Sequence, residues 1–225
     1  MDKLNFIDLF CGIGGFRYAL DSLDHNCVFS SDSDKDARRS YKNNFGEIPF
    51  GDITEIKNED IPAHQVLCAG FPCQPFSISG KQNGFSDTRG ILLHEILRIA
   101  KAHLPEVLFL ENVRNYTSHA GGKTMALTLD LLMGAGYNVF HKVLNSSRFG
   151  LAQKRERLYF VCFREDLGVS KFMFPMPCDS NVSIEDILLP KGDPALESLK
   201  INRDDVEMTI IPPEERENRP LRIGK

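Results

Sequence analysis

The stretch Leu4-Asn5-Phe6-Ile7-Asp8-Leu9-Phe10-Cys11-Gly12-Ile13-Gly14-Gly15 decides the fold of this 225-residue chain. Its first half has the apolar character and length of a buried strand, and residues 16–23 after the glycines have the spacing of an amphipathic helix. A strand, a glycine turn and a helix are typical of a nucleotide-binding βαβ unit. Because glycine lets a ligand approach the backbone closely, Gly12 and Gly14 are candidate binding residues.

An acidic residue follows the next expected strand, residues 27–30. Asp32 lies about 20 residues after the first glycine, which is the spacing of a ribose-binding carboxylate. Arg17 stands where a dinucleotide fingerprint has its third glycine, and the turn lacks the lysine of a P-loop, so an adenosine ligand without phosphates fits better. The alternative is that the glycines only make a tight turn and that Asp32 and Asp34 cap the following helix.

The rest of the chain alternates strands and helices, which predicts an α/β fold with a mostly parallel twisted sheet and helices on both faces. The spacing predicts helices over 35–45, 91–103 and 123–133, and strands before Gly51 and over 66–69, 107–110, 138–144 and 157–163. The last two strands are close enough in sequence to form an antiparallel pair. A short helix over 184–189 and a short strand over 206–211 are expected in the tail, where prolines break longer elements.

A candidate nucleophile is Cys73, in Leu67-Cys68-Ala69-Gly70-Phe71-Pro72-Cys73-Gln74-Pro75-Phe76-Ser77, although a structural role is the plainer interpretation of a cysteine in a turn without identified partners. The strand ends at Gly70, and Pro72 makes a rigid turn, so Cys73 is held at a carboxyl end of the sheet, where such folds bind ligands. The long polar segment 77–90 that follows is typical of a lid or binding loop. Its Lys81 and Arg89 suit phosphate contacts, although a solvated loop with incidental charge is the plainer interpretation.

Three further places in the chain carry candidate chemistry. Asp52 follows a short strand and suits either a hydrogen bond from an adenine amino group or a turn. Glu111 ends a fully apolar strand, so burial should raise its pKa and make it an acid rather than a counter-charge, unless it caps the next segment. In extended chain Arg155 and Arg157 share one face with Glu156 on the other, suited to a phosphate or base carbonyl, or to pairing with surface acids.

Composition bounds the class of protein. With 42% hydrophobic and 26% charged residues, no apolar run long enough for a membrane span and no signal peptide, we expect a soluble cytoplasmic protein without membrane contact. The six cysteines lack metal-ligand or disulfide spacing, so no metal is expected and most thiols should fill the core. Up to Glu165 the chain has 19 basic and 19 acidic residues, so any nucleic-acid grip must be local.

Together these segments resemble the C5-cytosine DNA methyltransferases, most closely those of bacterial restriction–modification systems. The resemblance covers residues 4–164, and the tail more thinly, and rests on DLFCGIGG (8–15), GDI (51–53), GFPCQPFS (70–77), ENV (111–113) and QKRER (153–157), in the family's order. It implies a Rossmann-like, S-adenosylmethionine-dependent methyltransferase fold. It also implies double-stranded DNA as substrate, with a target cytosine flipped out of the duplex.

The resemblance assigns roles to individual residues. It implies that Phe10, Asp32, Asp52, Ile53, Pro72 and Leu92 line the S-adenosylmethionine pocket, with Asp32 on the ribose and Asp52 on the adenine amino group. Cys73 is implied as the nucleophile that adds to cytosine C6, Glu111 as the acid at N3, and Arg155 and Arg157 as holding the base and the surroundings of the cysteine. Asn112 is implied to position the loop.

The sequence departs from the family in its last part. The family continues into a target-recognition domain and two further motifs, for which this sequence has no counterpart. We therefore expect a catalytic domain over 1–190 and an extension over 191–225, in either a truncated product or one subunit whose partner polypeptide carries the missing part. A cofactor-binding remnant without turnover and transfer to tRNA cytosine are the alternatives.

Overall fold

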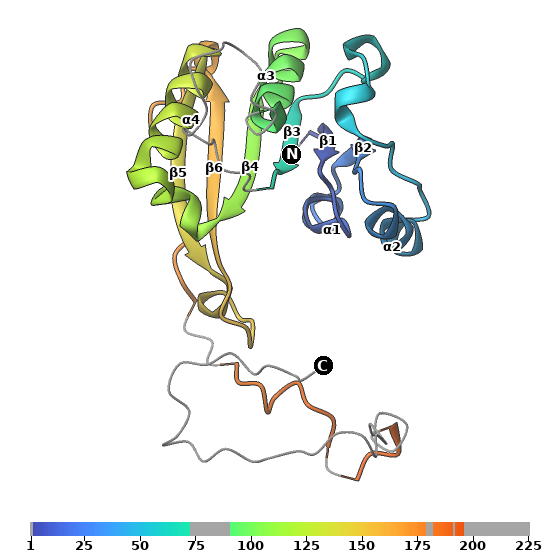
Figure 1. Cartoon of the computed structure of the whole chain (residues 1–225). Coiled ribbons are helices and arrows are strands. Elements are labelled where there is room, and N and C mark those ends of the chain that lie inside the picture. The colour runs from blue at the N-terminus through green and yellow to red at the C-terminus, as the bar shows by residue number, and fades with distance from the viewer. Residues whose placement is uncertain (1, 73–90, 179–181, 191, 196–225) are drawn as a thin grey trace. The chain divides into compact units, whose positions relative to one another are not determined.

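The computed structural model describes residues 2–72, 91–178, 182–190 and 192–195. The chain divides into two units, Met1–Ser183 and Ile184–Lys225. The first unit contains the sheet and the four α-helices of the described residues (Figure 1). No helix in the described ranges combines the length and the apolar character that crossing a membrane requires.

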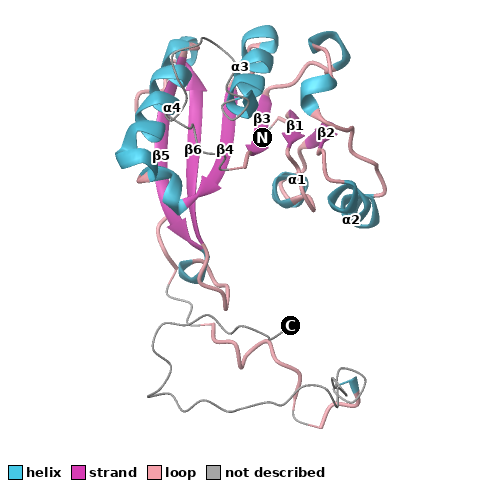
Figure 2. Ribbon diagram, viewed as in Figure 1, coloured by secondary structure: helices cyan, strands magenta, loops and turns pink. Residues whose placement is uncertain are grey.

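The sheet has six strands in the order β2-β1-β3-β4-β6-β5 (Figure 2). The strands are β1 Asn5–Leu9, β2 Asn26–Ser31, β3 Val66–Gly70, β4 Val107–Val113, β5 Tyr137–Asn145 and β6 Glu156–Arg164. The neighbours β2-β1-β3-β4 are parallel, whereas β6 runs antiparallel to both β4 and β5. The predicted α/β fold, with its mostly parallel sheet and antiparallel pair, is confirmed.

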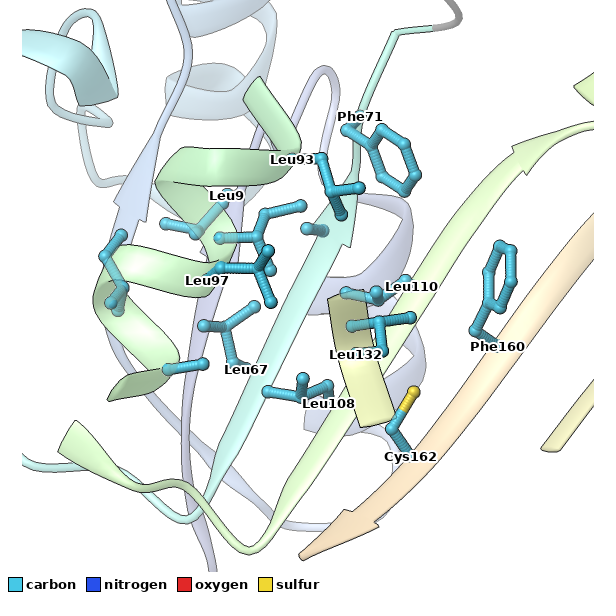
Figure 3. Close-up of a cluster of buried hydrophobic side chains, with 14 of the residues drawn as sticks. Leu9, Leu67, Phe71, Leu93, Leu97, Leu108, Leu110, Leu132, Phe160 and Cys162 are labelled. Carbon is cyan, nitrogen blue, oxygen red and sulfur yellow. The ribbon is translucent and has the colours of Figure 1, made fainter. Parts of the chain in front are cut away.

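Both faces of the sheet are covered, and the alternation of side chains along each strand explains how. One face carries Leu67 and Leu108, which pack with Leu93 and Leu97 of α3 (Ile91–His103) and Leu132 of α4 (Lys123–Gly134) (Figure 3). On the other face α1 (Gly15–Asp21) packs through residues that include Phe16 and Leu20 against a smaller cluster formed by Phe6, Val66, Cys68, Val107 and Phe109. Burial of both apolar layers fixes the register of the central strands.

The helix α2, Lys35–Phe45, has the predicted bounds because both of its ends carry capping residues. At its start the Asp34 side chain accepts hydrogen bonds from the backbone N–H groups of Asp36 and Ala37, both at 2.8 Å. At its end Gly46 adopts φ 78°, a left-handed conformation that glycine takes without strain. Asp34 thus has the capping role, which leaves Asp32 for another contact.

Three expectations about the elements are wrong. The third strand before Gly51 is reduced to a single parallel bridge between Phe50 and Ser31. The segment 184–189 forms turns, which include a hydrogen bond from the Ile187 N–H to the carbonyl of Ile184, instead of a helix. Glu111 lies within β4, opposite Tyr159, because pairing with β6 extends the strand to Val113. The strand expected over 206–211 lies outside the described residues.

Candidate active site

A cavity of about 510 Å³ opens at the carboxyl ends of β1, β2 and β3; we call it the Asp32 cavity. It brings together six of the eight predicted cofactor-binding residues, which come from five separate places in the sequence. These residues are Phe10, Asp32, Asp52, Ile53, Pro72 and Leu92. Ser31, Ser33, Thr54 and Gly70 complete the lining. The cavity has the size of a site for a small molecule.

Asp32 connects the end of β2 to the glycine turn. One of its carboxylate oxygens accepts the backbone N–H of Gly12 at 2.8 Å, and the other accepts that of Asp34 at 2.8 Å. A carboxylate oxygen has more than one lone-pair site, so Asp32 retains capacity for a ligand in the cavity. The two hydrogen bonds therefore hold the Asp32 side chain in place without occupying all the lone pairs of its carboxylate.

The two predicted glycines, Gly12 and Gly14, do not line the Asp32 cavity. Gly12 (φ 56°) presents its N–H to Asp32. Gly14 has φ 94°, and a Cβ there would overlap the ring of Phe45, with Cζ 2.7 Å away. The N–H of Gly12 thus orients the side chain of Asp32, and the absence of a side chain at Gly14 lets α1 and α2 pack closely.

Asp52 lies in the wall of the Asp32 cavity at the start of a short 3₁₀ turn, Ile53–Glu55. Its Oδ1 accepts the N–H of Thr54 at 3.0 Å and the Thr54 hydroxyl at 2.9 Å. The turn-forming role is therefore present. The other oxygen, Oδ2, accepts no hydrogen bond from the described part of the chain.

The backbone before Cys73 is held by Asn112. The Asn112 side chain is buried, and its Nδ2 donates to the carbonyl of Phe71 at 2.9 Å. The Phe71 ring packs edge-on against Tyr116, with centroids 5.7 Å apart. Pro72 lines the Asp32 cavity and is the last described residue before 73–90, so Cys73, Lys81 and Arg89 lie outside the described residues.

A second cavity, of about 690 Å³ and largely apolar, contains Glu111, Arg155 and Arg157; we call it the Glu111 cavity. Oε1 of Glu111 lies 2.7 Å from Nε of Arg157, so the expectation that Glu111 is no counter-charge is wrong. Burial nevertheless raises the pKa of Glu111 above its usual value, with the guanidinium groups of Arg157 and Arg155 opposing the rise. The predicted direction of the pKa shift is thus confirmed.

The two cavities adjoin, because Phe10 and Gly70 line both. Phe10 follows β1 and adopts φ 53°, which is rare for a residue with a side chain. Strain of this kind persists only where the surrounding structure imposes it, and it is frequent at functional sites. A ligand in the Asp32 cavity and one in the Glu111 cavity would both contact these two residues.

A third cavity, of about 400 Å³, lies where β4 ends and β6 begins. Its lining includes Arg114, Lys154, Arg155 and Arg157 with one acid, Glu156, and we call it the cationic cavity. Glu156 pairs with Arg114 at 2.7 Å, on a different side from the Arg157–Glu111 pair, as the alternation of 155–157 predicts. Arg114 and Lys154 were not among the site residues predicted from the sequence. The signals that could have identified them are adjacency to Arg155 for Lys154, and the position directly after the ENV block for Arg114.

Three of the five described cysteines lie in the interior. Cys11, Cys68 and Cys162 are buried, and burial raises the pKa of each thiol, which keeps them protonated and unreactive. The prediction that most thiols fill the core is confirmed for these three. Within the described ranges no group of three or more His, Cys, Asp or Glu side chains is arranged to hold a metal ion.

Comparison with known proteins agrees with this geometry. The C-5 cytosine-specific DNA methylase family matches residues 4–219. Among curated relatives, the type II methyltransferase M.HhaI of Haemophilus parahaemolyticus is 48% identical over 98% of this chain and 67% of its own length. M.HaeII of Haemophilus aegyptius is 50% identical over 84% of this chain, and M.HpaII of Haemophilus parainfluenzae is 45% identical over 86%.

The chain spans only part of these relatives, 58% of M.HaeII and 55% of M.HpaII. Among solved structures, the S. pombe Dnmt2 methyltransferase matches 90% of this chain with a TM-score of 0.61 at 24% identity. The Entamoeba histolytica methyltransferase EhMeth matches 81% with a TM-score of 0.62 at 21% identity. These structures show a shared methyltransferase fold, and with the family match over 4–219 the chain belongs to the C-5 cytosine-specific DNA methylase family.

Proposed function

We propose that this chain is the catalytic part of a DNA (cytosine-5-)-methyltransferase of a restriction–modification system. The observation that carries the proposal is the pair of adjoining cavities. One contains the carboxylates of Asp32 and Asp52 and the residue that precedes Cys73, and the other contains Glu111, Arg155 and Arg157. A methyl donor and a pyrimidine ring must meet in this way for direct transfer.

The residues of the Asp32 cavity fit S-adenosylmethionine. Asp32 would accept hydrogen bonds from the ribose hydroxyls, and Oδ2 of Asp52 is available for the adenine amino group. Phe10, Ile53, Pro72 and Leu92 would form apolar walls, and the buried Ser31 hydroxyl, which has no hydrogen-bond partner in the described ranges, offers a further polar contact. When bound, S-adenosylmethionine supplies an electrophilic methyl group on a sulfonium.

Cys73, Glu111 and the arginines would activate the cytosine. The thiolate of Cys73 forms a bond to C6 while Glu111 gives a proton to N3, which places the electron pair of the C5=C6 bond on C5 for attack on the methyl group. A base then removes the C5 proton, those electrons re-form the C5=C6 bond as the sulfur leaves, and N3 returns its proton to the Glu111 carboxylate. Arg155 and Arg157 would orient the base, and their guanidinium groups would stabilise the negative charge that develops on it.

Double-stranded DNA is the proposed partner, with the cytosine flipped out of the stack because neither C5 nor C6 is accessible to a side chain within it. The cationic cavity supports this partner, since Arg and Lys side chains are the usual contacts to backbone phosphates. The cytoplasm is the proposed location, with no part for a metal or a membrane.

We assign residues 1–190 to the catalytic domain and 191–225 to an extension. Because the relatives are longer, the activity proposed is that of the whole protein, with the remaining length in the same polypeptide or in a second one. The assay must therefore include a partner polypeptide that carries the remaining part of a relative such as M.HhaI.

The test is transfer of labelled methyl groups from S-adenosylmethionine to cytosine-containing duplex DNA, with and without that partner polypeptide. We expect transfer in the complemented assembly, its loss in Cys73→Ser, and a covalent adduct with DNA that contains 5-fluorocytosine. Cofactor binding without transfer under all conditions would identify a binding subunit instead. Transfer to tRNA in place of DNA would move the proposal to the RNA substrate.

A further inference from the structure

One wall of the Asp32 cavity is held by a residue that is distant from it in the sequence. The wall segment 52–54 is outside the sheet, and its own hydrogen bonds include those of Asp52 to Thr54 and the 3₁₀ contacts of the turn. Arg98 of α3 reaches this segment from more than 40 residues away. Its Nη2 donates to the carbonyl of Ile53 at 3.2 Å and to that of Ile56 at 3.0 Å, and its Nη1 donates to the side chain of Asn58.

Arg98 is itself fixed on its helix. Its Nε donates to Oε2 of Glu95 at 2.8 Å, and the side chains of Arg98 and Glu95 are 30% and 17% exposed, so the pair is partly shielded from water. A second contact runs the same way, because Nε2 of His103 lies 3.0 Å from the carbonyl of Asn58. The helix α3 therefore holds the segment 53–58 at two points.

The same helix also supplies part of the lining itself. Leu92 of α3 lines the Asp32 cavity, and it lies six positions before Arg98, about 9 Å along the helix axis. The helix thus contributes one cavity residue directly and, through Arg98, holds the backbone of Ile53, the residue that follows Asp52. The distance between Leu92 and the segment 52–54 therefore depends on the length and geometry of the contacts that the Arg98 guanidinium makes.

We propose that Arg98 is a positioning residue that sets the adenine end of the cofactor cavity. This inference rests on the proposed binding of S-adenosylmethionine in the Asp32 cavity. A planar guanidinium has five donors in a fixed fork and satisfies Ile53, Ile56, Asn58 and Glu95 together, whereas a lysine ammonium is a point charge that cannot span these acceptors. Arg98→Lys therefore keeps the charge and removes the geometry.

The experiment measures the affinity of the full chain for two ligands, S-adenosylhomocysteine and its inosine analogue, which lacks the adenine amino group. We expect Arg98→Lys to weaken the adenosine ligand about tenfold, as loss of a charge-assisted hydrogen-bond set predicts, and to weaken the inosine ligand much less. The ratio of the two affinities should therefore fall. Loss of folded protein alone does not change this ratio in the folded fraction.

Arg39→Lys is the matched control. Arg39 is also a helical arginine in an i,i+3 ion pair, with Asp36 of α2 at 3.1 Å, but it does not line the cavity. Its replacement should leave both affinities unchanged. Asn58→Ala, which removes one acceptor and retains Arg98, should shift the ratio in the same direction by a smaller factor, and it serves if Arg98→Lys does not fold.

The outcomes separate this inference from the proposed function. If the unmodified chain binds neither ligand, the assignment of the Asp32 cavity to S-adenosylmethionine fails, and the role of Arg98 fails with it. If the unmodified chain prefers the adenosine ligand but neither Arg98→Lys nor Asn58→Ala lowers the preference, the cofactor assignment stands and Arg98 has only a structural role.

Discussion

At the scale of single residues, Glu111 combines two opposing effects. Burial in the Glu111 cavity favours its neutral form, while the Arg157 guanidinium at 2.7 Å favours the charged form. The effect of burial is the larger one, so the pKa of Glu111 is raised although the group is ion-paired. A raised pKa favours the protonated form of the carboxyl group, which suits an acid at a ring nitrogen.

Replacing Glu111 by Gln should lower methyl transfer by about 10²–10⁴-fold, the usual contribution of a positioned general acid, and leave S-adenosylmethionine affinity unchanged. Glutamine keeps the shape but has no proton to give. The measurement is single-turnover transfer in the complemented assembly beside direct cofactor binding. Glu165→Gln, at an exposed position outside the three cavities, is the control, and equal losses in both variants would contradict the role.

Asp8 predicts a dependence of stability on pH. It lies in β1, fully buried, and neither carboxylate oxygen has a hydrogen-bond partner in the described ranges. Burial raises its pKa to about 7, and the positive charge of nearby Arg17, which makes no hydrogen bond of normal length to Asp8, offsets part of the rise. Because the folded state then holds a proton that the unfolded chain has lost, the free energy of unfolding should fall as pH rises from about 4 to 7.

Asp8→Asn removes this titration. The difference in unfolding free energy between Asp8→Asn and the unmodified chain should therefore move in favour of the variant over that pH range, and stay flat above it. Denaturant unfolding at a series of pH values measures the difference, in which the other carboxylates cancel. A difference that does not change with pH would show that Asp8 titrates alike in the folded and unfolded chain.

At the scale of elements, the sequence predicted the bounds of those helices and strands that neighbouring residues determine. The bounds of α2 follow from Asp34 and Gly46, which are visible in the sequence. The length of β4 was underestimated because its last residues are polar and are kept in the strand by pairing with β6, more than 40 residues later. Arg98 was missed for the same reason, since nothing in a helical pattern reveals acceptors at Ile53 and Ile56.

Two adjacent glycines test the packing of α1 against α2. Gly14→Ala should destabilise the chain by about 1–3 kcal/mol, because the new Cβ overlaps the Phe45 ring and φ 94° is strained for alanine. Gly15→Ala is the matched control: its Cβ would meet no atom within 4 Å at the first position of the helix. It should be neutral or stabilising by about 0.5–1 kcal/mol.

Thermal and denaturant unfolding of the two variants provide the comparison. Opposite signs are expected, since the substitutions are chemically identical and the positions differ by one residue. Equal destabilisation would mean that the turn, and not the contact with Phe45, imposes the need for glycine.

At the scale of the whole molecule, charge is distributed unevenly. The chain has a net charge of −4, yet the cationic cavity gathers four basic side chains around one acid. The sequence predicted that any grip on nucleic acid must be local, but it could not place Arg114 beside Lys154, since β4 and β6 bring them together. Of the six predicted residues of the Asp32 cavity, Asp32 and Asp52 were candidates from their positions after strands, and the others were identified by resemblance to a family. The geometry then supplied the additional lining residues Ser31, Ser33, Thr54 and Gly70.

If the cationic cavity contacts DNA phosphates, Arg114→Gln and Lys154→Gln should each weaken binding across unrelated sequences. Each should also reduce the slope of log affinity against log salt by about 0.9, because one fewer counterion is released. The measurement is DNA binding by the complemented assembly between low and physiological salt. Lys142→Gln, an exposed lysine of β5 that lines none of the three cavities, is the control, and an equal slope in all variants would contradict the contact.

The antiparallel insertion of β6 makes the polarity of the Glu111 cavity a property of strand alignment. The pairing of Val113 with Arg157 and of Glu111 with Tyr159 turns Arg155 and Arg157 toward Glu111 and leaves Glu156 for Arg114. If β6 slipped by one residue, the side chain of Glu156 would face Glu111, and Arg155 and Arg157 would point to the other face of the sheet. A misaligned sheet would thus bring like charges together in a cavity where the correct alignment pairs opposite ones, with no change in composition.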